Sequence, residues 1–138
     1  VLNDICRHGN HVGATLAVTP TSDSATVLQR VMRDVREGPI GVHFDPAVFV
    51  MSGQSVGDAM RTLHDVLAHI QIRDAVRDID GSGQEVPVGR GEVDWEEFLA
   101  LLEETAYRGW LTVDRTRGDD PAGDVTRAIQ YLNEVAQG

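Results

Sequence analysis

The sequence predicts an α/β protein in which four strand–helix (βα) units build one parallel sheet. Short runs rich in β-branched residues alternate with segments whose apolar residues recur at helical spacing, which is the pattern of βα units. Gly, Pro, Ser and Asp separate these segments, as they do at turns and helix starts. The chain has 138 residues, of which 41% are hydrophobic, and this is enough for one packed core. We therefore expect a single domain over residues 1–138.

The predicted strands and helices alternate along the chain. We expect strands at 14–20, 40–45, 69–75 and 110–115, and helices within 1–8, 21–39, 56–68, 95–109 and 121–137. Ser22 or Ser24 can cap the second of these helices and Asp94 the fourth, because their side-chain oxygens can accept hydrogen bonds from the first free amides. The pattern leaves a loop through Pro46 and Gly53, and a long Gly-rich loop after the third strand.

The two faces of the predicted strands differ in polarity. One face is apolar and should pack against the helices; it carries Leu16, Val18, Val42, Phe44, Ile70, Ile72, Leu111 and Val113. The other face is mostly polar and carries Thr15, Ala17, Thr19, Gly41, His43, Asp45, His69, Gln71, Arg73, Trp110, Thr112 and Asp114. A doubly wound sheet buries both faces under helices, whereas a barrel enzyme opens its inner face to a site at the carboxyl ends of its strands. The polar face therefore favours a barrel.

Four strands cannot close such a barrel, because a packed barrel of this kind needs eight. Left alone, the first and last strands would be unpaired edges, and exposed edges invite pairing with another chain. A two-fold homodimer satisfies both edges at once, because the last strand of each chain then pairs with the first strand of the other. The alternative is an open flavodoxin-like parallel sheet, in which helices would have to bury the polar face.

Charge and composition exclude several classes of protein. Lys and Arg total 12 against 22 Asp and Glu, so the formal net charge is -10, and nucleic acid and anionic membrane surfaces would repel the chain. Cys6 is the only cysteine, which excludes an internal disulfide and a cysteine-rich zinc site. No apolar run approaches the roughly 18 residues of a membrane span. We expect a cytoplasmic protein that binds neither nucleic acid nor membranes.

The acidic stretch that begins at Asp78 has the alternating ligands of a calcium loop. An EF-hand loop also needs a glutamate at its twelfth position. Counting from Asp78, that position is Gly89, and Pro87 stands where the loop would have to curl around the ion. We therefore interpret the stretch as the loop after the third strand, at the end of the sheet where binding loops gather.

Three segments carry a resemblance to a known family: GVHFDPAVFVMSG (41–53), AHIQIRDA (68–75) and VGRGEVDWEEFLALLEETAYRGWLTVDR (88–115). They resemble the C-terminal half of sugar phosphate isomerases/epimerases of the xylose isomerase-like TIM-barrel (AP endonuclease family 2) superfamily, over about residues 14–135. Members have eight barrel strands, and the four strands here match the last four. The resemblance implies half a TIM barrel and a small sugar or sugar phosphate as ligand. We expect homodimerisation to complete a (βα)8-like barrel.

Members of that family bind a divalent metal ion with a glutamate, an aspartate, a histidine and a second glutamate. The corresponding positions are Thr19, Asp45, Gln71 and Asp114. The resemblance therefore keeps one ligand, shortens one and loses two, and it implies that an Mn, Mg or Zn ion would be held by Asp45 and Asp114. A hard cation prefers several anionic oxygens or imidazoles, so we expect a degenerate metal site.

The strand ends hold the candidate catalytic residues, which are Asp45, His69, Gln71, Arg73 and Asp114. Asp45 could act as a metal ligand or a general base, and His69 or His43 could exchange protons. Arg73 could bind an anionic group of a substrate or pair with Asp45 or Asp114. Gly89 and Gly91 form a plain turn or let backbone amides approach a phosphate.

Two functions remain open. The first is a half-barrel homologue of sugar phosphate isomerases/epimerases with little or no family activity, which Thr19 and Gln71 favour. The second is an active metal-dependent sugar (phosphate) isomerase/epimerase with a composite site in a dimer, in which the metal polarises a carbonyl while a base moves the adjacent proton.

Overall fold

The sheet consists of four parallel strands in the order β1–β2–β3–β6. A computed structural model describes the whole chain, Val1–Gly138. The strands are β1 (Leu16–Val18), β2 (Ile40–Phe44), β3 (Leu67–Ile72) and β6 (Leu111–Val113). Phe44 pairs with Ile70 and Ile72 with Val113, so the carboxyl ends of the strands lie close together. The four predicted strands are confirmed, although each is shorter than expected or shifted by a few residues.

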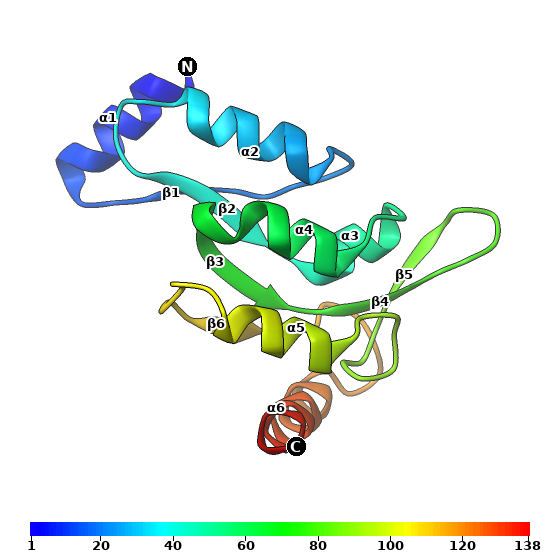
Figure 1. Ribbon diagram of the computed structural model, residues 1–138. Helices are drawn as coiled ribbons and strands as arrows, with labels where there is room; N and C mark the ends of the chain where they lie inside the picture. Colours follow the sequence, from blue (N-terminus) through cyan, green and yellow to red (C-terminus); the bar gives the residue numbers. More distant parts are fainter.

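Helices cover one face of this sheet (Figure 1). They are α1 (Leu2–Val12), α2 (Ala25–Asp34), α4 (Val56–Leu63), α5 (Trp95–Glu103) and α6 (Pro121–Gln137), with a 3-10 turn η1 (His64–Val66) between α4 and β3. In Figure 1, α2, α4 and α5 lie beside one another along the sheet, with α1 and α6 at its two ends. Side-chain oxygens cap α2, α4, α5 and α6 at Ser24, Ser55, Asp94 and Asp120. The caps predicted at Ser24 and Asp94 are confirmed, and no helix is long and apolar enough to span a membrane.

The core lies between these helices and the apolar face of the sheet. Its members include Val42, Phe44, Ile70 and Ile72 of the strands, Leu28 and Met32 of α2, Phe49 between β2 and α4, Met60 and Leu63 of α4, and Trp95 and Phe98 of α5. Burying an apolar side chain of this size contributes about 1.5–3 kcal/mol, so these positions fix which face carries the helices. Leu111 was expected in the core but is 42% exposed, because β6 lies at an edge of the sheet.

The opposite face of the sheet is polar and remains partly open to solvent. His43, His69 and Gln71 are half-buried there, and Thr112 is exposed. β1 pairs only with β2 and β6 only with β3, so the sheet has two unpaired edges. The strands lie in chain order, whereas a flavodoxin-like sheet has the order 2-1-3-4-5. The arrangement is half of a parallel barrel, and the flavodoxin-like alternative is wrong.

Residues 46–51, expected in a loop, form the short helix α3 (Pro46–Met51). Asp45 caps this helix, because its Oδ1 accepts a hydrogen bond of 3.0 Å from the amide of Ala47. Pro46 suits the first helical position, where no amide hydrogen is needed. Asp45 is therefore fixed in place by the helix that follows it.

The Gly-rich stretch after β3, also expected to be a loop, contains an antiparallel hairpin of β4 (Asp74–Arg77) and β5 (Gly83–Val86). The hairpin projects beyond the rest of the molecule (Figure 1). At its tip, Asp80 accepts hydrogen bonds from the amide and hydroxyl of Ser82, at 2.9 and 2.7 Å. The alternating acidic residues therefore shape a turn.

The helix predicted over 95–109 ends at Glu103. Two residues further on, the hydroxyl of Thr105 donates to the carbonyl of Leu102 at 2.7 Å, and the amide of Thr105 donates to the same oxygen. This tight turn replaces the next helical turn. Tyr107 lies beyond the helix, although it still packs against the core as expected.

Asp74 fixes the loop between the hairpin and α5. Its carboxylate is fully buried and accepts hydrogen bonds of 2.9 to 3.2 Å from the amides of Ala75, Gly89, Gly91 and Val93 and from the indole of Trp95. A Cβ on Gly91 would lie 2.1 Å from the Asp74 carboxylate, so glycine is needed for this close approach. The amides of Gly89 and Gly91 do bind an anion, and that anion is the protein's own carboxylate.

Candidate functional site

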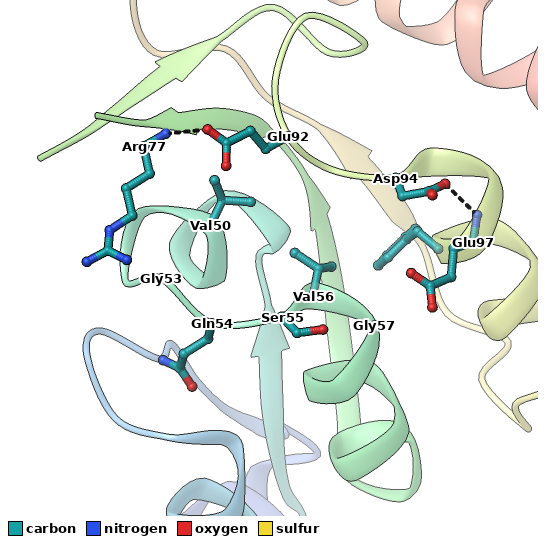
Figure 2. Close-up of a pocket in the computed structure, with 11 residues that line it drawn as sticks. Val50, Gly53, Gln54, Ser55, Val56, Gly57, Arg77, Glu92, Asp94 and Glu97 are labelled. Atoms are coloured by element: carbon teal, nitrogen blue, oxygen red, sulfur yellow. Dashed lines mark hydrogen bonds between the residues drawn. The ribbon is translucent and has the colours of Figure 1, made fainter. Parts of the chain in front are cut away.

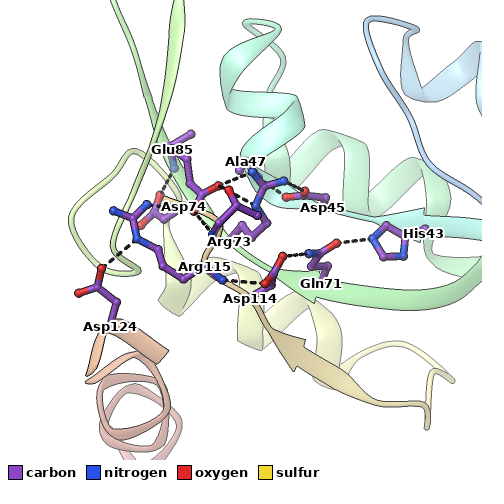
Figure 3. Close-up of polar contacts among 12 residues, drawn as sticks. His43, Asp45, Ala47, Gln71, Arg73, Asp74, Glu85, Asp114, Arg115 and Asp124 are labelled. Atoms are coloured by element: carbon purple, nitrogen blue, oxygen red, sulfur yellow. Dashed lines mark hydrogen bonds and ion pairs between the residues drawn. The ribbon is translucent and has the colours of Figure 1, made fainter. Parts of the chain in front are cut away.

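Polar side chains meet at the carboxyl ends of β2, β3 and β6, where Asp45, Arg73 and Asp114 follow the last strand residues (Figure 3). They belong to two networks. One is a chain of hydrogen bonds across the open face of the sheet, and the other is a cluster of ion pairs that reaches the β4–β5 hairpin.

The hydrogen-bond chain links four side chains of β2, β3 and β6 with Asp114, which follows β6. Thr112 Oγ1 lies 2.8 Å from His69 Nε2, and His69 Nδ1 lies 3.0 Å from His43 Nδ1. His43 Nε2 lies 2.6 Å from Gln71 Oε1, and Gln71 Nε2 donates to Asp114 Oδ2 at 2.7 Å. These residues alternate along their strands, which is why they share one face.

With both imidazoles neutral, one arrangement of protons satisfies every bond in this chain. The Asp114 carboxylate accepts, so Gln71 presents its oxygen to His43, which must donate from Nε2. The bare Nδ1 of His43 then accepts from Nδ1 of His69, whose Nε2 accepts from the hydroxyl of Thr112. Burial and the neighbouring His43 lower the pKa of His69, which favours the neutral ring. A proton can pass between the imidazoles, but the amide of Gln71 separates them from Asp114.

We expect nuclear magnetic resonance to find His43 protonated on Nε2 and His69 protonated on Nδ1 at neutral pH. Long-range proton–nitrogen correlations distinguish the two tautomers directly. The exposed rings of His8, His11 and His64 provide internal references in the same spectrum. The opposite assignment, with His69 protonated on Nε2, would contradict the chain as described.

The ion-pair cluster joins the strand ends to the hairpin. Arg73 Nη1 donates to Asp45 Oδ2 at 2.8 Å, and its Nε donates to Glu85 Oε2 at 3.2 Å. Arg115 donates from Nη1 to Glu85 and from Nε to Asp124, both at 2.9 Å. The side chains of Asp45 and Glu85 are only 2% and 4% exposed, so solvent screens these pairs weakly.

Asp45 and Glu85 differ in how far their hydrogen-bond and ion-pair partners offset the effect of burial on the pKa. Burial raises the pKa of Asp45, and the charge of Arg73 offsets this only in part. Burial also raises the pKa of Glu85, but hydrogen bonds from Thr116 and Arg73 outweigh it and bring the pKa to about 2. Glu85 is therefore ionised at neutral pH and anchors the cluster.

Four of the five predicted site residues lie at the carboxyl ends of the strands, whereas His69 lies farther back, in the middle of β3, and the five are divided between the two networks. Arg73 pairs with Asp45, and Asp114 instead accepts hydrogen bonds from Gln71 and from the amide of Arg115. The catalytic roles assigned to these residues remain predictions.

Sequence reasoning missed Glu85, because the segment around it was expected to be an irregular loop. Asp80-Gly81 is a pair that favours hairpin turns, and it could have indicated β4 and β5. Arg115 and Thr116 were missed because they follow β6 in a segment without a recognisable motif.

The four positions that correspond to metal ligands do not fit a divalent ion as they stand. Thr19 offers no anionic oxygen, and Gln71 has both amide atoms in hydrogen bonds. Asp45 uses one oxygen to cap α3 and the other to bind the guanidinium of Arg73. No group of three or more His, Cys, Asp or Glu is arranged to hold a metal ion. A cation at Asp45 would have to displace Arg73.

A cavity of about 420 Å³ lies elsewhere, on the helix side of the sheet (Figure 2). It is lined by the turn between α3 and α4, by Arg77, and by the segment that leads into α5. Glu92 accepts a hydrogen bond of 2.8 Å from the amide of Arg77, and Asp94 caps α5 at 2.9 Å. None of the predicted site residues lines this cavity, so the strand ends remain the candidate site.

Comparison with known proteins identifies one family. The profile of a family described as xylose isomerase-like TIM barrel matches residues 1–135. No protein among the curated ones matches the sequence.

Solved structures match the fold. A xylose isomerase domain protein from Planctomyces limnophilus is 28% identical, with a TM-score of 0.89 over 99% of this chain and 51% of that one. A D-tagatose 3-epimerase-like protein is 16% identical, with a TM-score of 0.80 over 99% and 52% of the two chains. A xylose isomerase-like TIM barrel protein from Mycobacterium smegmatis in complex with magnesium is 17% identical, with a TM-score of 0.78 over 96% and 47%. The chain spans about half the length of each of these structures.

Proposed function

Because the chain belongs to the xylose isomerase-like TIM-barrel family, we propose that it supplies the C-terminal half of a sugar isomerase/epimerase-type site and has little or no metal-dependent activity as it stands. The ligand is a small sugar or sugar phosphate. Its hydroxyl groups both donate and accept hydrogen bonds, and they suit a face that offers hydroxyl, imidazole, amide and carboxylate groups.

The contact between Arg73 and Asp45 carries this proposal. Asp45 is the one ligand position that keeps its residue type, and its second oxygen bonds the guanidinium at 2.8 Å. Glu85 holds Arg73 in place from the other side. A positive charge thus already lies where the retained carboxylate would meet a metal ion.

We expect millimolar Mn, Mg or Zn to leave the melting temperature unchanged, because a ligand stabilises a protein only by binding its folded state. Sugar isomerase and epimerase assays with the same ions should show no turnover above background. The control is Asp45→Asn, which removes the charge of the retained ligand. A rise in melting temperature in the wild type that is lost in Asp45→Asn would refute the proposal.

The double variant Thr19→Glu/Gln71→His tests whether lost ligands explain the lack of metal binding. It should acquire a melting temperature that rises with Mn, because the added carboxylate and imidazole would bind the ion strongly enough to displace Arg73 from Asp45. The two single variants serve as controls and should respond less. A double variant without a metal response would show that Arg73, rather than the missing ligands, closes the site.

A second candidate function is an active enzyme with a composite site formed by two copies of the chain. The two unpaired sheet edges favour it. Apolar side chains are exposed near both edges, with Trp110 83% and Leu111 42% exposed at β6, and Ile5 47% and Val12 59% exposed on α1.

Light scattering over a concentration series tests the composite site. A self-closed barrel predicts a dimer that Trp110→Ser weakens. Val27→Ser is the matched control, because Val27 is 49% exposed on α2, away from both edges. A monomer at every concentration would remove this candidate and leave a different half-barrel as the partner.

A further inference from the structure

The carboxylate of Glu85 is enclosed by hydrogen-bond donors on both of its oxygens. Oε1 accepts from Arg115 Nη1 at 2.9 Å and from the amide of Thr116 at 3.1 Å. Oε2 accepts from Thr116 Oγ1 at 2.6 Å, from Arg73 Nε at 3.2 Å and from Arg73 Nη2. Two guanidinium groups, a hydroxyl and a backbone amide are the donors that proteins use to bind carboxylates and phosphates.

The donors and the carboxylate come from different parts of the chain. Arg73 follows β3, and Arg115 and Thr116 follow β6, so all three belong to the carboxyl ends of the parallel strands. Glu85 belongs to the projecting β4–β5 hairpin (Figure 1). The donors therefore follow strands of the parallel sheet, whereas the carboxylate belongs to a hairpin outside that sheet.

The two arginines have partners of their own besides Glu85. Arg73 is held by Asp45 at 2.8 Å, and Arg115 is held by Asp124 at 2.9 Å. The side chains of Arg73 and Arg115 are only 18% and 10% exposed. Both guanidinium groups would thus remain oriented if the carboxylate of Glu85 were withdrawn.

We propose that Arg73, Arg115 and Thr116 form an oxyanion-binding site for the carboxylate or phosphate group of a sugar-sized ligand, and that Glu85 occupies this site as an internal substitute. The hairpin thereby blocks the site until a ligand replaces Glu85. The sugar part of the ligand rests on the function proposed above, whereas the oxyanion site stands on its own contacts.

The charges around the site favour a singly charged group. Glu85, Asp45 and Asp124 carry three negative charges and Arg73 and Arg115 carry two positive ones, so the cluster has a formal net charge of minus one. An external carboxylate in place of Glu85 keeps this balance, whereas a doubly charged phosphate adds another negative charge. The low pKa of Glu85 agrees with an environment of hydrogen-bond donors that stabilises an anion.

Chemical rescue of Glu85→Ala tests the site. The variant should melt below the wild type, and formate or acetate should restore about half or more of the lost melting temperature by filling the vacated position. Inorganic phosphate should restore less. Chloride at matched ionic strength should not restore it, and the wild type, whose site is filled, should respond to none of the oxyanions beyond chloride.

Two control variants test whether the anion acts at the position that Glu85 leaves. Gln84→Ala alters the neighbouring residue of the same hairpin and should show no selective response to formate. Glu85→Ala/Thr116→Val removes one donor to the anion and should be rescued less than the single variant. A greater effect of phosphate than of formate would assign the site to phosphate-bearing ligands.

The proposal is overturned if no oxyanion stabilises folded Glu85→Ala more than chloride does. If that variant does not fold, Glu85→Gln replaces it, because an amide nitrogen cannot accept from the guanidinium groups and formate should displace it. Formate should then shift the amide resonance of Thr116 more strongly than in the wild type. Equal shifts in the two proteins would also overturn it. Because these measurements use neither metal nor sugar, their outcome is independent of the tests of the proposed function.

Discussion

The wild-type protein is expected to lose about 3 kcal/mol of its free energy of unfolding through Glu85 alone as the pH falls from 4.5 to about 2. The pKa of Glu85 is depressed to about 2 from its ordinary value of 4.5, so the unfolded chain takes up this proton first. The stabilisation is therefore complete above pH 4.5 and disappears as the pH approaches 2. Urea unfolding at a series of pH values measures this loss.

Glu85→Gln should show a flatter dependence of stability on pH over the same range, because it has no proton to gain at this site. It should also be less stable than the wild type at neutral pH, since Arg73 and Arg115 lose their shared carboxylate. Asp80→Asn is the control on the same hairpin. Hydrogen bonds from Ser82 lower the pKa of Asp80, but this carboxyl is fully exposed and contributes little to stability. Parallel pH curves for the wild type and Glu85→Gln would contradict the prediction.

Asp74→Ala is expected to lower the free energy of unfolding by about 3–5 kcal/mol. The change removes the acceptor of five hydrogen bonds inside the protein and leaves their donors without a partner. Hydrogen exchange should accelerate at the amides of Gly89, Gly91 and Val93 before it does so in the core strands. Asp74→Asn keeps one acceptor oxygen but turns a donor toward these amides, so it should fall between the alanine variant and the wild type.

Asp78→Ala is the matched control for Asp74→Ala, because Asp78 lies in the same hairpin and is exposed. It should change stability by less than about 0.5 kcal/mol. Similar losses in the two variants would mean that the hairpin as a whole, rather than the buried carboxylate, stabilises this region.

The sheet and its covering helices could be predicted because their side chains follow simple periodicities. Val42, Phe44, Ile70 and Ile72 alternate with polar residues, and this alternation correctly separated the core from the open face. Ser24 and Asp94 could be recognised as helix starts because a capping side chain bonds only to an amide in the first turn of its own helix. The hairpin was missed because its strands are short and mostly polar, and they lack the apolar alternation of a half-buried strand.

The candidate site could be predicted only where strand position determined it. Asp45, Arg73 and Asp114 were placed correctly because each follows directly on a strand. The fifteen-residue separation of Asp74 from Gly89 and the thirty-residue separation of Glu85 from Arg115 follow no local period. Such contacts depend on how the hairpin folds back on the strand ends, which one sequence does not reveal.

The helices at the two ends of the sheet restrict what can complete the barrel. α1 packs on β1 and α6 packs on β6, so the chain already brings a covering helix to each of its open edges. An eight-stranded barrel has eight grooves between neighbouring strands, and each holds one helix. Two copies of this chain would bring α1 of one and α6 of the other to the same groove. The composite dimer would therefore have to move one of these two helices at each junction, whereas a half with four strands and only three covering helices would leave every groove singly filled.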